Sequence, residues 1–232
     1  MKIKIIASGS KGNCYLINDG KTSLLIEGGI PIKQIQVSCD FKLNEVSGCL
    51  ISHQHRDHCK AVPDLIKKGI DVYAHSSVFE SFHTSGYRCI NLGDSTTITI
   101  GTFKILTFDC EHDVPNLGFL IWSEITKERL LFFTDTFYLK YKFGGLGIIM
   151  AECNYSIEAV NESIERGYIP HEMKKRLLTS HMSLEHFLGM LKANDLSRVK
   201  QIYLLHLSDN NSRENEFKKA VQELVGCEVY VC

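Results

Sequence analysis

The feature of this 232-residue chain that most limits its fold is a cluster of three histidines and one aspartate within six residues. The cluster, His53-Gln54-His55-Arg56-Asp57-His58, directly follows the apolar run Cys49–Ser52, which we predict to be a buried strand. Imidazole and carboxylate groups are metal ligands, and an extended loop can point His53 and His55 to one side while the last two residues turn towards a second position. The cluster therefore favours two adjacent metal ions. The competing interpretation is four polar residues on an ordinary surface.

The composition is typical of one globular domain. Hydrophobic residues make up 44% and charged residues 23%, and no linker rich in Pro, Gly or Ser divides the chain. We therefore expect a single domain spanning residues 1-232. No apolar run approaches the ~20 residues of a membrane-spanning helix. The segment Met1–Ile6 alternates like a strand and lacks the apolar stretch of a signal peptide.

The nine cysteines are scattered, odd in number and without a Cys-x-x-Cys pair. They indicate reduced thiols rather than a disulfide framework or a zinc ribbon, so we expect a cytoplasmic protein with no membrane association. The net charge of -1 gives no global attraction for polyanions, so a nucleic-acid substrate would have to be held by a local patch.

Alternating patterns and short apolar runs predict strands in both halves of the chain. The expected strands are Lys2–Ala7, Cys14–Asn18, Ser23–Glu27, Cys49–Ser52, Asp71–Ala74, Thr96–Ile100, Phe103–Phe108, Gly118–Ser123, Leu130–Thr134, Gly147–Glu152, Gln201–Leu205 and Glu228–Val231. The expected helices are Ala61–Lys68, Ser156–Gly167, His171–Ser180, Leu184–Ala193 and Arg213–Leu224. The regular β-α alternation of a doubly wound sheet is missing. We therefore expect an α+β fold with two β-sheets face to face and helices outside.

The pattern His-x-His-x-Asp-His is the hallmark of the metallo-β-lactamase superfamily, which this chain resembles. Its later motifs follow in the family's order, with His112 in Glu111-His112-Asp113, Asp135 in Thr134-Asp135-Thr136, and His206 after the run Ile202–Leu205. The resemblance implies a four-layer αββα sandwich of two mixed β-sheets with two divalent metal ions per chain. It implies that His53, His55 and His112 bind the first ion, that Asp57, His58 and His206 bind the second, and that Asp135 bridges them.

Within the superfamily, the chain is most similar to the YycJ/WalJ-like branch of small, single-domain enzymes that resemble DNA exonucleases. The shared segments are Ser8–Asn13, His112-Asp113, Leu117–Phe119, Glu152–Asn154, Lys175-Arg176, His181–Ser183, His206–Ser208 and Asn210-Asn211. The chain departs from the usual pattern at Glu27, Phe137, Tyr155 and Ser180, where Asp, Gly, His and Gly are typical. These departures leave the ligands unchanged and limit the transfer of an exact substrate.

The resemblance implies metal-dependent hydrolysis of a phosphodiester in DNA. Zinc or manganese suits this ligand set, and iron is a third candidate. Two ions ~3.5–4 Å apart can share an attacking hydroxide, which Asp57 would orient while His181 contacts the phosphate or protonates the leaving oxygen. Further candidate substrate contacts are Ser10 and Asn13 in the glycine-rich turn, and Lys175 and Arg176, with Lys140, Lys142 and Lys174 as candidates for the DNA backbone.

Other functions use the same chemistry. A small ester, thioester or small phosphodiester is the alternative substrate, because the same hydroxide can attack a carbonyl carbon. A flavodiiron oxygen reductase typically carries Glu at the position of His55 and an attached flavin domain, and this chain has neither. A non-catalytic binding module would leave a complete ligand set without a purpose. The sequence indicates no obligatory protein partner and no oligomeric state.

Overall fold

The computed structural model describes residues 1–208 and 212–232, without the side chains of His171 and Met173. The segment Asn210-Asn211, which the chain shares with the YycJ/WalJ-like branch, lies outside the described residues. The chain divides into two compact units. Unit 1 comprises Met1–Asp109 and Val114–Glu128, and unit 2 comprises Cys110–Asp113 and Arg129–Cys232. The single domain expected for residues 1-232 stays a prediction.

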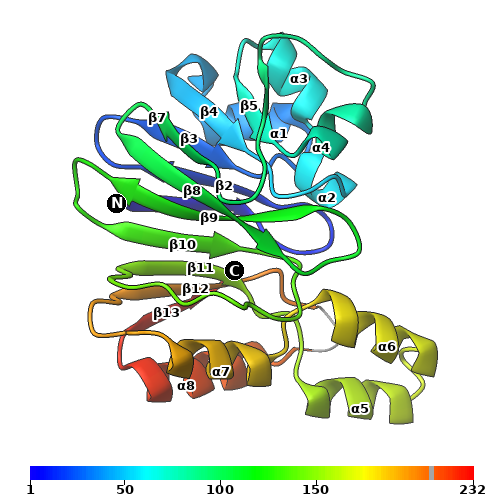
Figure 1. Ribbon diagram of the computed structural model, residues 1–232. Helices are drawn as coiled ribbons and strands as arrows, with labels where there is room; N and C mark the ends of the chain where they lie inside the picture. Colours follow the sequence, from blue (N-terminus) through cyan, green and yellow to red (C-terminus); the bar gives the residue numbers. More distant parts are fainter. Residues whose placement is uncertain (209–211) are drawn as a thin grey trace. The chain divides into compact units, whose positions relative to one another are not determined.

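Unit 1 contains a mixed six-stranded sheet in the order β1-β2-β3-β4-β5-β6 (Figure 1). Its strands are β1 (Lys2–Ala7), β2 (Cys14–Asn18), β3 (Ser23–Ile26), β4 (Val46–Leu50), β5 (Val72–Ala74) and β6 (Cys89–Asn91). The pairs β1-β2 and β2-β3 are antiparallel, whereas β3 to β6 are parallel. The turn between β2 and β3 contains Asp19-Gly20, as the sequence predicts for a hairpin.

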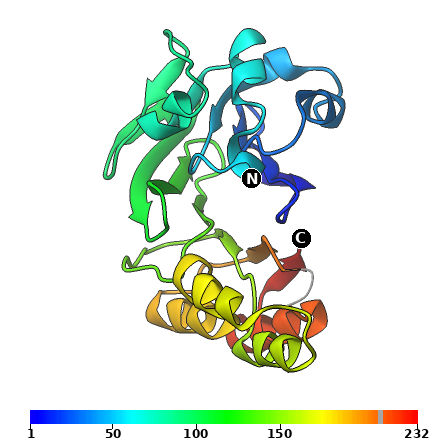
Figure 2. The same cartoon turned by 90° about the vertical axis from the view of Figure 1, so that its right-hand side faces the viewer.

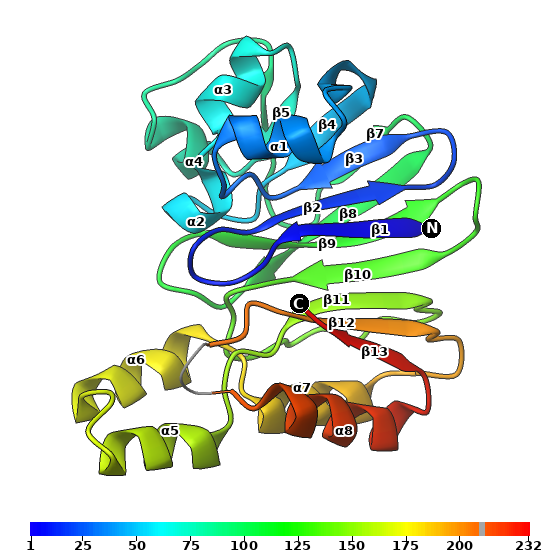
Figure 3. The same ribbon diagram turned by 180° about the vertical axis from the view of Figure 1, so that it is seen from behind.

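Short helices cover the parallel half of this sheet. They are α1 (Ile32–Ser38), α2 (Arg56–Cys59), α3 (Val62–Lys67) and α4 (Ser76–Glu80), with a 3-10 turn at Leu43–Glu45. Fully buried residues of β3, β4 and β5 pack in one cluster with Ile35 of α1 and Leu65 of α3. Figure 3 shows α1 and α3 beside these strands from behind. Unit 1 also holds β7 (Thr97–Ile100), β8 (Phe103–Cys110) and β9 (Asn116–Ser123), of which β7 and β8 pair antiparallel.

Unit 2 is built on four parallel strands. They are β10 (Arg129–Phe133), β11 (Ile148–Glu152), β12 (Gln201–Leu205) and β13 (Glu228–Val231), paired in that order. All five residues of β11 are buried, as expected for a parallel strand covered on both faces. The helices are α5 (Ile157–Glu165), α6 (His171–Ser180), α7 (Leu184–Ala193) and α8 (Glu214–Val225). Figure 2 shows them gathered on one side of the strands of unit 2.

The mixed sheets and their helices confirm the predicted α+β class. All nine cysteines are free thiols, six of them buried, so the expected reduced state agrees with the structure. Within the described residues, no helix has the length and apolar character needed to cross a membrane. The sequence prediction missed α1, α2, α4 and β6, each of which has at most seven residues. Such short elements show too few periods to be recognised.

Candidate metal centre

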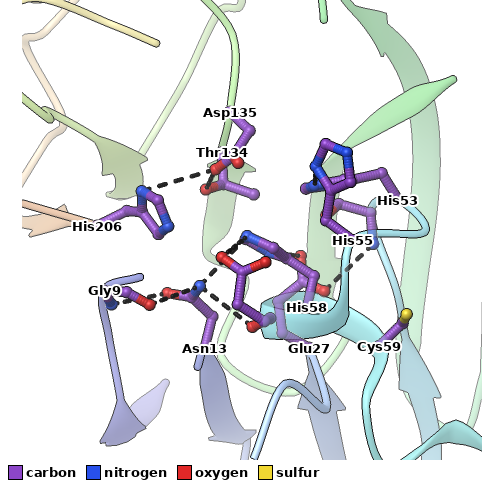
Figure 4. Close-up of polar contacts among 12 residues, drawn as sticks. Gly9, Asn13, Glu27, His53, His55, His58, Cys59, Thr134, Asp135 and His206 are labelled. Atoms are coloured by element: carbon purple, nitrogen blue, oxygen red, sulfur yellow. Dashed lines mark hydrogen bonds and ion pairs between the residues drawn. The ribbon is translucent and has the colours of Figure 1, made fainter. Parts of the chain in front are cut away.

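The His-x-His-x-Asp-His motif leaves β4 in extended form and ends in the helical turn α2. Three rings lie close together at this point (Figure 4). The ring centroids of His53 and His58 are 4.2 Å apart, and His53 Nε2 lies 3.1 Å from His55 Nδ1. Asp57 Oδ2 lies 3.3 Å from His58 Nε2. The structure therefore brings the four predicted ligands of unit 1 together.

Buried side chains contact the Nδ1 atoms of His53 and His58 and orient both rings. Ser52 Oγ lies 2.9 Å from His53 Nδ1, which leaves His53 Nε2 as the outward ligand atom. The fully buried Glu27 places Oε1 3.4 Å from His58 Nδ1 and accepts a long hydrogen bond of 3.4 Å from the Ser52 N–H at Oε2. Glu27 also adopts a left-handed φ of 63°, which is uncommon for a non-glycine residue. The longer carboxylate thus reaches the motif despite the departure from Asp.

The backbone of Asp57 is held by the glycine-rich turn after β1. Asn13 donates its backbone N–H to Asp57 O at 2.7 Å, and its side-chain amide donates to Gly9 O at 3.1 Å and to Asp57 O at 3.3 Å. The side-chain oxygen of Asn13 accepts from Gly9 N and Tyr15 Oη, both at 3.0 Å. Asn13 is fully buried, so these contacts support a positioning role.

Gly29 lies too close to the backbone of Asp57 for any side chain. A Cβ atom at Gly29 would lie 1.6 Å from Asp57 O and 2.2 Å from Asp57 C. Both are backbone atoms, so only glycine permits this approach. The Gly28-Gly29 pair therefore allows the metal motif to pack against the end of the first hairpin.

In unit 2, one carboxylate faces two imidazoles. Asp135 follows β10 with a left-handed φ of 48° and accepts a hydrogen bond of 2.8 Å from Thr134 Oγ1. Asp135 Oδ2 lies 3.9 Å from His112 Nε2, and Asp135 Oδ1 lies 3.8 Å from His206 Nδ1. His112 Nδ1 lies 3.2 Å from Ser180 O, to which its N–H donates, and His112 Nε2 lies 3.0 Å from Asp113 Oδ1, so Nε2 is the candidate ligand atom. This arrangement is the one expected of a bridging carboxylate.

Glu152 is a functional candidate to which the sequence prediction gave no role, although it lies in the shared segment Glu152–Asn154. It ends β11 and is fully buried, and its Oε1 lies 2.6 Å from His181 Nδ1. Its Oε2 accepts from the N–H groups of Thr136 and Met182 at 3.1 and 3.2 Å. Ligand atoms of Asp135, Glu152, His181 and His206 lie within 4.8 Å of one another. A buried Glu at the end of an apolar strand was the available signal.

Each member of the Glu152–His181 pair stabilises the charged form of the other. Burial alone would lower the pKa of His181, but the charge of Glu152 and the hydrogen bond to it outweigh burial and raise this pKa. Burial raises the pKa of Glu152, yet the charge of His181 and the hydrogen bonds from the two histidines lower it overall. The pair therefore stabilises a carboxylate facing an imidazolium, with the His181 side chain still 17% exposed.

The predicted substrate contacts occupy different environments. Ser10 is exposed in the turn after β1, whereas Asn13 is buried. Lys175 and Arg176 are exposed on α6, and the neighbouring Lys174 donates to Asn161 Oδ1 at 2.7 Å. Substrate roles for these residues stay predictions.

The donor set fits divalent metal ions. Its atoms are imidazole nitrogens and carboxylate oxygens, which zinc, manganese and iron accept. The 3.1 Å between His53 Nε2 and His55 Nδ1 is close to the roughly 3.3 Å that separates two nitrogens on one tetrahedral zinc ion. The buried and hydrogen-bonded second partners of His53 and His112 are typical of metal-binding histidines.

Comparison with known proteins agrees with this site. The family described as a β-lactamase superfamily domain matches residues 40–207. The exodeoxyribonuclease WalJ of Streptococcus pneumoniae is 30% identical over 99% of this chain and 90% of its own length. The exodeoxyribonuclease YycJ of Bacillus anthracis is 26% identical over 92% of this chain and 85% of its own.

A solved structure shows the same fold. The metallo-β-lactamase fold protein YhfI of Bacillus subtilis superposes with a TM-score of 0.76 at 17% identity, over 99% of this chain and 95% of YhfI. The chain therefore belongs to the metallo-β-lactamase superfamily and is a metal-dependent hydrolase. Within that superfamily it belongs to the YycJ/WalJ-like branch.

Proposed function

We propose that this protein is a DNA exonuclease that hydrolyses phosphodiester bonds with two divalent metal ions, zinc or manganese, with iron as the third candidate. The names of its relatives WalJ and YycJ support DNA as the substrate, because the similarity covers nearly the whole chain. A cytoplasmic location is part of the proposal, and the nine free thiols support it.

The proposed ligand assignment keeps the family order of the motifs. His53, His55 and His112 would hold one ion, Asp57, His58 and His206 the other, and Asp135 both. The position of Asp135 between His112 and His206 supports its bridging role. Bound divalent ions supply Lewis acidity towards the phosphate and lower the pKa of a water molecule. Asp57, anchored through its carbonyl by Asn13, orients the nucleophile.

His181 is the residue we assign to the leaving oxygen. Glu152 accepts a hydrogen bond from its Nδ1, so Nε2 is the nitrogen that donates the proton. The same contact orients the ring and stabilises its charged form. Ser10, Asn13, Lys175 and Arg176 stay proposed substrate contacts. Because Asn13 is fully buried, a positioning role in the turn is the competing assignment.

The Glu152–His181 pair is the observation that carries the proposal. Cleavage of a phosphodiester expels an alkoxide, which is a poor leaving group and needs a proton in the transition state. A thioester expels a thiolate, which is stable near neutral pH and needs little help. A charged donor beside Asp135 and His206 is therefore more useful for DNA than for the alternative thioester substrate.

Degradation of 5′-phosphorylated linear duplex DNA with added Mn²⁺ or Zn²⁺ tests this function. We expect wild-type protein to shorten the DNA from its ends, and Asp57→Asn and His58→Ala proteins to leave it intact. Circular DNA of the same sequence is the matched substrate, because an exonuclease cannot attack it. Intact linear DNA in the presence of wild-type protein with two metals bound per chain would contradict the proposal and favour a small ester, thioester or phosphodiester.

A further inference from the structure

A groove in unit 2 is not explained by the metal chemistry. It lies between the segment Tyr138–Lys142, which follows Asp135, and helix α7, and it has a volume of about 310 Å³. Besides this segment, Met182, His186 and Met190 line it. Apolar, aromatic and polar side chains therefore line the groove.

His186 of α7 and Asn194, which directly follows α7, make hydrogen bonds at the two ends of this segment. His186 Nδ1 lies 3.0 Å from Phe137 O, to which its N–H donates. At the other end, the Phe143 N–H donates to Asn194 Oδ1 at 2.7 Å, and the Asn194 amide is itself held by Met190 O at 2.8 Å. These hydrogen bonds thus hold the two walls of the groove together without a ligand.

The segment between these two ends presents aromatic and basic groups in alternation. Tyr138, Lys140 and Lys142 are exposed, whereas Leu139 is buried and Tyr141 is half-buried. This period of two is typical of an extended chain, in which alternate side chains share one side. Tyr138 is 55% exposed, so part of its ring is accessible to a ligand.

The charges of the groove favour an anionic ligand. Lys140 Nζ lies 5.2 Å from the Tyr141 ring centre and 3.8 Å from Glu111 Oε1. Glu185 is the acidic side chain that lines the groove, and its Oε1 accepts the Ile157 N–H at 3.1 Å. Two lysines and one carboxylate, Glu185, line the groove, and Glu111, which does not line it, pairs with Lys140.

We infer that this groove binds unpaired nucleotides of the DNA substrate, with a base stacked on Tyr138 and the backbone phosphates beside Lys140 and Lys142. The inference rests on the proposed nuclease function and names its substrate form. Aromatic faces that stack bases and lysines that follow the backbone are the usual elements of sequence-independent single-strand binding. A volume of about 310 Å³ suits a base or two and is far too small for a duplex.

The position of the groove in unit 2 agrees with this role. Its first lining residue comes three positions after Asp135, and Met182 in its wall directly follows His181. Both neighbours belong to the candidate centre, and all groove residues lie in the same unit. A DNA strand bound in the groove would therefore extend to His181, which we assign to the leaving oxygen of the phosphodiester.

Binding to metal-free protein tests the inference without cleavage. Fluorescence anisotropy with a labelled short oligothymidylate in EDTA should give Tyr138→Ala a Kd about 5- to 150-fold higher than wild type, the range for loss of one stacked base. The double variant Lys140→Ala/Lys142→Ala should lower the slope of log K against log salt by about 1.4. A blunt duplex should compete poorly.

Matched controls separate the groove from general effects. Tyr168→Ala removes another exposed tyrosine of unit 2, and Lys218→Ala/Lys219→Ala removes two exposed lysines of α8, so both proteins should bind like wild type. Wild-type affinity and salt slope in the groove variants would overturn the inference, as would equal binding of the blunt duplex. DNA cleavage combined with that result would leave the nuclease function standing. Normal groove binding without any cleavage would overturn the nuclease function instead.

Discussion

A histidine that protonates a leaving oxygen matters most when that oxygen leaves poorly. His181→Ala should therefore lower kcat on DNA by about 10²- to 10⁴-fold, because it removes the proton that we assign to His181 Nε2, the ring nitrogen opposite the one bound to Glu152. The loss should be much smaller with a p-nitrophenyl ester of thymidine 5′-monophosphate, whose leaving phenolate needs no proton. Steady-state kinetics on both substrates check this.

Glu152→Gln serves as the companion variant for the same pair. It keeps the shape of the residue but removes the charge that holds the proton on His181, so it should show the same dependence on the leaving group. Equal losses on both substrates would assign His181 to phosphate binding rather than to proton donation.

Asn13 separates a positioning role from substrate contact. Asn13→Ala removes side-chain hydrogen bonds to Gly9 and to Asp57 O, so it should cost about 1–3 kcal/mol of unfolding free energy and weaken metal binding. Urea unfolding and metal titration measure both. Asn18→Ala is the control, since its amide bonds Ser23 Oγ at 2.7 Å away from the motif. A raised KM for DNA with unchanged metal affinity would instead support direct substrate contact.

At the scale of single residues, the sequence indicates candidate ligands more readily than the residues that hold them in place. His53 and His55 are proposed as ligands from their residue type and spacing alone. Glu152 and His181 meet across 29 positions of sequence, and no local period shows such a pair. Asn13 is a further case, because it was named as a substrate contact from its place in the glycine-rich turn, and its side-chain amide donates to the Asp57 carbonyl.

At the scale of elements, Asp19 fastens three turns and strand ends of unit 1. Its carboxylate accepts from Thr102 Oγ1 at 2.6 Å, from Ser123 Oγ at 2.8 Å and from the Thr22 N–H at 2.9 Å. Burial raises the pKa of Asp19, but these hydrogen bonds to the charged form lower it overall. The hairpin of β2 and β3 is thereby tied to the β7–β8 turn and to the end of β9.

This network predicts a pH-dependent contribution to stability. The pKa of an aspartate in the unfolded chain is about 3.9, and that of Asp19 in the folded protein is lower. The stabilisation is therefore fully present above the pKa of the unfolded chain and is lost as the pH falls through the pKa of the folded protein. Asp19→Asn should cost about 2 kcal/mol at neutral pH, and the difference from wild type should shrink as the pH falls below 4. Urea unfolding at several pH values measures it, with the exposed Asp40→Asn as control. A constant difference would contradict this role.

Elements with a clear apolar pattern were predictable, including strands of four and five residues, whereas the short helices α1, α2 and α4 were not. The bounds of β1, β2, α6, α7, β12 and β13 agree with the sequence prediction to the residue. Helix α4 has five residues and depends on its cap, where His75 accepts the Ser77 N–H. Helix α2 contains Asp57 and His58, which were expected to turn from an extended loop. Such elements are fixed by caps and tertiary packing, which a pattern of apolar residues does not contain.

At the scale of the whole molecule, the proposed ligands are divided between the two units. His53, His55, Asp57 and His58 belong to unit 1, and His112, Asp135 and His206 belong to unit 2. In the family assignment each ion takes ligands from both. Saturation with metal to 100 times Kd should raise Tm by about 5–10 °C per site, because a bound ion stabilises the folded state.

Metal stoichiometry checks this assignment. Native mass spectrometry should find two ions on wild-type protein but only one on each single variant, because His55→Ala and His112→Ala lose the first ion while His58→Ala and His206→Ala lose the second. Each variant should also lose part of the metal-induced rise in Tm. His75→Ala is the control, since His75 caps α4 and is no proposed ligand. Two ions retained by His112→Ala, with a wild-type rise in Tm, would show that unit 1 binds its metal without unit 2 and would overturn the shared assignment.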